Sequence, residues 1–130
     1  MNIYDKNNNL VGIHIKSESI AEGKNFLTDP SNPLQLGTFN LNKGTLIPNH
    51  IHKKQERKIL TTGEVLVVLE GEILVSFYEE DLELLTEITV KKYEAIAMYS
   101  GGHGIEVLEN TKFIEIKQGP YLEDMDKELF

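Results

Sequence analysis

Short apolar runs separated by polar or glycine-containing turns follow one another along most of the chain. The most apolar run, residues 65–69 (VLVVL), follows Glu64 and ends at Gly71. Residues 34–41 alternate apolar with small or polar side chains, which is typical of a half-buried strand. Strands are expected at residues 3–5, 10–15, 34–41, 45–52, 64–69, 73–78, 82–90, 93–99, 105–108 and 113–117. About ten short strands with frequent turns predict an all-β sandwich or barrel.

No low-complexity tract or linker interrupts this pattern, so residues 1–130 are expected to form a single domain. Residues 1–33 are interpreted as an N-terminal hairpin followed by a loop rich in Gly and Pro, and residues 34–121 as the barrel. Residues 122–130 form a tail. A short helix is predicted over residues 122–129, because acidic residues gather where its first turn would lie and favour the helix dipole.

Two histidines, His50 and His52, stand one residue apart in the middle of the chain, and Glu64 follows twelve residues after His52. On a strand, positions two apart share one face, so both imidazoles are expected to project together. An isolated pair of this kind also suits a solvated strand edge. Two imidazoles and a carboxylate on the inner face of a sheet, in contrast, suit a divalent metal such as Zn, Mn, Fe or Ni.

The spacing Gly44-x5-His50-x-His52, followed by Glu64-x6-Gly71, resembles the first signature motif of the cupin superfamily. The resemblance implies that His50, His52 and Glu64 are metal ligands. Cupins usually place the glutamate closer to the second histidine, at the spacing that Glu56 has, so Glu56 is the alternative ligand. Glu64 is preferred because it heads an apolar strand that ends in a glycine turn, whereas Glu56 lies in the charged segment KKQERK.

His103 is flanked by glycines in the segment SGGHG, where positive φ and close backbone approach are accessible. The second cupin motif supplies a histidine at this point of the strand order, although Tyr93-Glu94 stands where that motif has Gly-Asp. The stretch SGGHGIEVLENTKFIEIKQGPY is also similar to a branch of small bacterial cupins with a GGHG second motif. Over residues 35–121, the resemblance implies a cupin-type barrel or jelly roll that holds one divalent metal through His50, His52, Glu64 and His103.

Three imidazoles and one carboxylate leave positions open on a six-coordinate metal for water, dioxygen or a chelating substrate. The resemblance therefore implies a metal-dependent enzyme of the isomerase, epimerase or dioxygenase type. A polar set around the inferred mouth (Arg57, Lys58, Lys117, Gln118 and Tyr121) favours an oxygen-rich substrate, such as a sugar derivative or hydroxy acid, with Arg57, Lys58 and Tyr121 as substrate-binding candidates. The alternative is a non-catalytic cupin module that binds a small ligand.

The composition limits the classes of partner and of chemistry that the protein is expected to use. The net charge of −8 argues against nucleic acid and anionic membranes, and the absence of cysteine excludes disulfide and thiolate chemistry. No signal peptide or apolar span is visible, so a cytoplasmic protein is expected.

In residues 64–69, Leu66 and Val68 share the face of Glu64, while Val65 and Val67 point the other way. Both faces are apolar and need cover, which predicts a homodimer, the solution that cupins commonly adopt.

Overall fold

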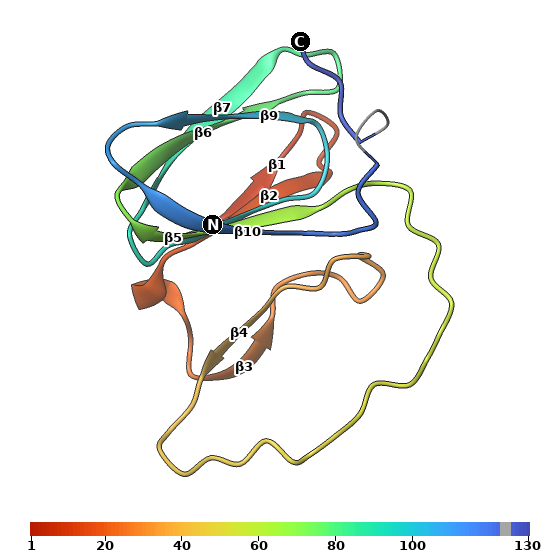
Figure 1. Ribbon diagram of the computed structural model, residues 1–130, viewed down its shortest axis with the longest axis vertical. Coiled ribbons are helices and arrows are strands. Elements are labelled where there is room, and N and C mark those ends of the chain that lie inside the picture. Colours follow the sequence, from red (N-terminus) through yellow and green to blue (C-terminus); the bar gives the residue numbers. More distant parts are fainter. Residues whose placement is uncertain (123–125) are drawn as a thin grey trace. The chain divides into compact units, whose positions relative to one another are not determined.

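The computed structural model describes residues 1–122 and 126–130 and is all-β, as predicted (Figure 1). The chain divides into two compact units: residues 1–19 with 61–130, and residues 20–60. The sheets formed by the described residues do not close into a barrel, so that part of the expectation is wrong. The cupin-type jelly roll and the single domain stay predictions.

The larger unit contains two antiparallel sheets. A five-stranded sheet has the order β1-β2-β8-β5-β10, and a three-stranded sheet has the order β7-β6-β9. The strands are β1 (Asn2–Tyr4), β2 (Leu10–Ile15), β5 (Glu64–Glu70), β6 (Glu72–Tyr78), β7 (Leu84–Lys91), β8 (Ala95–Met98), β9 (Gly102–Val107) and β10 (Lys112–Lys117). The 3-10 turn Ser17–Ser19 follows β2. Each of these strands overlaps a predicted one, although β9 begins three residues before the strand predicted at 105–108. The hairpin of β1 and β2 is confirmed.

The core lies between the inner faces of the two sheets. Val75 and Phe77 of β6 pack in one buried cluster with Leu66 of β5 and Ile96 of β8. These residues recur at every second position of their strands, as a half-buried sheet requires. The full cluster contains Ile3, Val11, Leu66, Val68, Ile73, Val75, Phe77, Val90, Ile96 and Met98.

The turn between β5 and β6 depends on Gly71, whose φ is +81°. A side chain there would bring its Cβ within 2.5 Å of the Asn110 carbonyl oxygen. Positive φ and close backbone approach both favour glycine. The glycine therefore ends the most apolar strand, as the sequence indicated.

The smaller unit, residues 20–60, contains one two-stranded sheet of β3 (Gly23–Phe26) and β4 (Gly37–Asn40). Strand β4 falls within the predicted strand 34–41, whereas β3 was expected to be loop. The strand predicted at residues 45–52 is not formed, and residues 41–63 contain no strand or helix. The apolar residues of this segment predict a strand, but a strand forms only where a partner accepts and donates its backbone hydrogen bonds. Pro48 also removes one donor.

The predicted C-terminal helix is not seen. Residue 122 and residues 126–130 are irregular, and the other three positions of the predicted helix, 123–125, lie outside the described residues. A helix of eight residues gains little from its own hydrogen bonds and needs a packed face. Tertiary contacts of Asp126 and Phe130 with three strands, β6, β9 and β10, hold the tail instead.

The outer face of the five-stranded sheet is apolar at its β5–β10 edge. Ile114 and Ile116 are opposite Val67 and Val65 and about half exposed. These exposed apolar side chains are consistent with the prediction that another element covers this face. The homodimer stays a prediction. Within the described part of the chain, no helix has the length and apolar character that crossing a bilayer demands.

Candidate functional site

Glu64 and His103 reach one another from two different sheets. Glu64 opens β5 opposite Met98, and His103 lies on β9 opposite Phe77. Directly opposed residues on antiparallel strands share a face, and both partners belong to the core, so both polar side chains lie at the end of the core. His103 Nε2 donates to Glu64 Oε2 at 3.1 Å, with side chains 32% and 14% exposed. Two of the four predicted ligands therefore meet. His103 lies within β9, ahead of the strand that was predicted to begin at residue 105.

Lys117, at the end of β10, joins this pair. Its Nζ lies 3.5 Å from Glu64 Oε1, 3.2 Å from Glu115 and 3.6 Å from Asp126, and 5.1 Å from the centre of the Tyr121 ring. The hydrogen bond to Glu115 and the neighbouring carboxylates raise the pKa of Lys117, so its ammonium stays charged. Among the described residues, three carboxylates around one ammonium leave a local charge of −2 when His103 is neutral.

Two polar side-chain atoms, one of Gln118 and one of Tyr99, are buried near the strand ends that carry this cluster. Gln118 Oε1 accepts the amide of Gly63 at 2.9 Å, which fixes the chain just before Glu64. Among the described residues, the Gln118 Nε2 and the Tyr99 hydroxyl have no hydrogen-bond partner. Burial raises the pKa of Tyr99 to about 12, so the phenol keeps its proton as a hydrogen-bond donor.

His50 and His52 belong to the smaller unit, where both are exposed and neither lies in a strand. Their rings pack edge to face with centroids 5.2 Å apart. His50 Nδ1 donates to the Pro48 carbonyl at 2.9 Å, which leaves a lone pair on Nε2 of the neutral ring. The two histidines are adjacent as predicted, but by ring packing and not by strand geometry.

The predicted ligands thus form two pairs, Glu64 with His103 in the larger unit and His50 with His52 in the smaller. Outside residues 123–125, no group of three or more His, Asp or Glu side chains is close enough to hold a metal ion. Glu56, Arg57 and Lys58 are exposed in the irregular segment of the smaller unit, and their roles as ligand or substrate-binding residues stay predictions. Tyr121 lies beside Lys117.

His14, the remaining histidine, forms a separate buried pair. Its Nε2 lies 2.8 Å from Glu94 Oε2, and the His14 side chain is only 4% exposed. Glu94 also accepts the Lys91 amide at 3.0 Å. Burial alone would raise the pKa of Glu94, but these hydrogen bonds outweigh it and hold that pKa below its usual value. The pair ties the turn before β8 to β2, which is a structural role.

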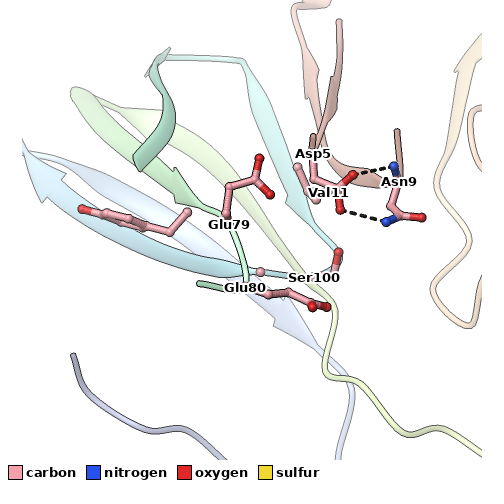
Figure 2. Close-up of a pocket in the computed structure, with 8 residues that line it drawn as sticks. Asp5, Asn9, Val11, Glu79, Glu80 and Ser100 are labelled. Carbon is pink, nitrogen blue, oxygen red and sulfur yellow. Dashed lines mark hydrogen bonds between the residues drawn. The ribbon is translucent and has the colours of Figure 1, made fainter. Parts of the chain in front are cut away.

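A pocket of about 240 Å³ lies beside Tyr78 and Gly101, at the same strand ends. Figure 2 shows Asp5 on its wall, joined to Asn9 by hydrogen bonds. Glu79, also on the wall, accepts the amide of Lys6 at 2.9 Å. Both carboxylates accept hydrogen bonds from backbone amides of the turn between β1 and β2, so these hydrogen bonds have a structural role.

No family model matches the chain, and no curated protein or solved structure matches it. The site therefore stands on its own geometry. Sequence reasoning omitted Asp126 and placed Lys117 only loosely at the mouth. One signal was present: in residues 113–117 the alternation puts Glu115 and Lys117 on one face and Ile114 and Ile116 on the other.

Proposed function

We propose that the protein is a cupin-like metalloprotein that binds one divalent metal ion through Glu64 and His103, with His50 and His52 as further ligands. The proposed activity is that of a metal-dependent enzyme on a polar, oxygen-rich small molecule. The observation that carries the proposal is the 3.1 Å contact between Glu64 Oε2 and His103 Nε2, two donors 39 positions apart in the chain.

The separation of these two donor atoms supports the proposal. Nitrogen and oxygen ligands lie about 2.0–2.2 Å from a metal such as zinc, so two ligands of one ion are roughly 2.8–3.6 Å apart. Glu64 Oε2 and His103 Nε2 fall within that range, and a bound ion would take the place of the proton that His103 Nε2 donates to Glu64. Both are held by strands, and Lys117 also orients Glu64 through its second oxygen.

Charge and donor chemistry support it as well. A dication would neutralise the local charge of −2 around Lys117. The free Nε2 of His50 is the unprotonated atom that a metal ligand needs. When bound, the metal would supply a Lewis acid or lower the pKa of bound water. Glu64 and His103 would hold the ion, and Lys117 would balance the charge of the carboxylates.

Metal titration tests the proposal. Wild-type protein and single variants E64Q, H103A, H50A and H52A would be titrated with Zn²⁺ and Mn²⁺ by calorimetry, with E56Q as the matched carboxylate control. We expect one ion per chain, with affinity lowered at least tenfold in E64Q and H103A and unchanged in E56Q. A loss in E56Q with full retention in E64Q would identify Glu56 as the ligand. Wild-type affinity in both E64Q and H103A would refute the site.

The alternative is a non-catalytic ligand-binding module. It would bind the same metal as the enzyme but would not convert its ligand into a product. A panel of sugar derivatives and hydroxy acids, incubated with metal-loaded protein, separates the two. Product formation that E64Q abolishes supports the enzyme. Binding without turnover across the panel supports the module.

A further inference from the structure

The last residues of the chain return to the Glu64–His103 pair. Asp126 Oδ2 lies 3.6 Å from Lys117 Nζ, and the same ammonium contacts Glu64. The Asp126 side chain is only 12% exposed. Of the carboxylates that contact Lys117, Glu64 and Glu115 lie on strands, whereas Asp126 lies on the irregular tail. One partner of Lys117 can therefore leave while the sheet stays intact.

The terminal residue forms a second anchor. The Phe130 ring packs edge to face on Tyr78, with centroids 5.1 Å apart and an interplanar angle of 86°. A Cβ added to Gly102 would lie 2.7 Å from Phe130 Cζ, so the ring lies directly against the backbone of β9. Gly102 immediately precedes His103. The absence of a side chain at this position is what gives the ring its place.

The two anchors lie on different sheets. Lys117 belongs to β10 of the five-stranded sheet, and Gly102 and Tyr78 belong to β9 and β6 of the three-stranded sheet. In Figure 1 the C-terminus lies beside the turn that joins β6 to β7, which agrees with the contact between Phe130 and Tyr78. Glu64 and His103 join the same two sheets. The tail therefore links the two sheets at the same strand ends as the pair.

We propose that residues 126–130 form a C-terminal strap that closes over the Glu64–His103 pair and must open before a metal ion reaches it. The gating role rests on the proposed function, whereas the strap itself does not. Opening is cheap, because Phe130 is 64% exposed in the closed state and Lys117 keeps Glu64 and Glu115 as partners. The strap is thus a closure that thermal motion can release.

Trypsin cleavage after Lys127 tests the strap in the native chain. The released peptide, residues 128–130, would be followed by mass spectrometry for wild type, D126N and G102A. The methyl group of G102A would displace the Phe130 ring, which is the end of a flexible side chain. We expect cleavage to accelerate about two- to fivefold in each variant, the factor that loss of one weak ion pair gives. Because Asp126 and Glu128 flank the cleaved bond, each rate would be divided by that of a free peptide of residues 118–130 with the same tail sequence. After this correction, E128Q, which removes an exposed tail charge, should leave the rate unchanged. Equal rates in wild type, D126N and G102A would overturn the strap.

A fluorescence reporter gives an independent reading. The chain contains no tryptophan, so F130W introduces a single emitter at the anchor. Acrylamide quenching of the introduced indole should rise measurably when D126N is added, because the ion pair no longer favours closure. The rise is limited because the ring at position 130 is already 64% exposed in the closed state. L129A, at an exposed neighbour, is the control. An indole equally quenched with and without D126N contradicts the closed strap.

Gating is tested with Co²⁺, followed by its absorbance after rapid mixing. We expect the association rate to rise about two- to fivefold in D126N, in parallel with cleavage. Faster cleavage with an unchanged Co²⁺ rate would overturn the gating role and leave the strap. A chain that binds no Co²⁺ would overturn the proposed function and the gate together, while trypsin alone still judges the strap.

Discussion

Two regions of the chain differ in how much apolar surface they bury. One is the double sheet, formed by residues 1–19 and 61–130, and the other is the segment of residues 20–60. Every member of the buried apolar cluster belongs to the double sheet. In residues 20–60 the single buried residue is Thr28, which is polar. Three of the four prolines also lie in that segment. The first region is held by packed side chains, and the second by local turns and one short hairpin.

This difference matters for the candidate ligands. Glu64 and His103 are held in place by strand pairing before any ligand arrives. His50 and His52 lie on an exposed, irregular segment, so ordering them on a metal costs conformational entropy at the time of binding. One half of the proposed ligand set is preorganised, and the other half is not.

Trypsin should reveal the largest contrast. We expect cleavage after Lys53, Lys54, Arg57 and Lys58 at least a hundredfold faster than after Lys91 or Lys117, which end β7 and β10. Cleavage within sheet structure requires opening that costs a sizeable share of the folding free energy, whereas the exposed segment needs almost none. Mass spectrometry of early time points measures both rates.

Saturating Zn²⁺ sharpens this comparison. If His50 and His52 become ligands, cleavage in the segment should slow, because binding orders it. E64Q provides the control that should abolish the protection. Similar rates of cleavage at the two groups of sites without metal would contradict the contrast between the regions.

Phe77 and Phe39 offer the next test. Phe77 is 1% exposed in the core, whereas Phe39 is 47% exposed in the smaller unit. F77A should lower the free energy of unfolding by about 3–5 kcal/mol, as expected for a buried aromatic ring. F39A should cost less than about 1 kcal/mol. Urea denaturation followed by circular dichroism measures both, and equal losses would show that the smaller unit has a comparable core.

The smallest effect concerns pH. Glu94 has a folded-state pKa below its usual 4.5, so its stabilising contribution is complete above that value and is lost as pH falls through the folded-state pKa. E94Q should destabilise the protein by about 1–3 kcal/mol at neutral pH, because the charged hydrogen bonds to Lys91 and His14 are lost. The deficit should shrink as the pH drops below about 4.5.

Urea titrations between pH 3 and 7 measure this narrowing. D29N is the matched control in the smaller unit. In the wild-type protein, hydrogen bonds from Ser31 also lower the pKa of the Asp29 carboxylate, but at an exposed site. A pH-independent deficit in E94Q would mean that the carboxylate charge is not what stabilises the pair.

The sequence by itself determined the strands of the double sheet. Their two-residue alternation, and turns such as Gly71, depend on neighbours in the chain and can be read locally. It also indicated Glu64 and His103, although through a motif and not through their contact. The same local pattern predicts a strand at residues 45–52 and a helix at residues 122–129, and neither is seen in the described residues. A strand or a short helix persists only when another element supplies hydrogen bonds or a packed face.

Only the tertiary structure decided which polar groups meet. His103 is 39 positions from Glu64, and no local pattern specifies that their strands end at the same side of two packed sheets. Lys117 contacts Glu64 for the same reason, through the register of β10 on β5. The tail contacts of Asp126 and Phe130 have no periodic signal at all. Long-range contacts arise from how sheets stack and register, which is a property of the whole packed core and not of any one segment.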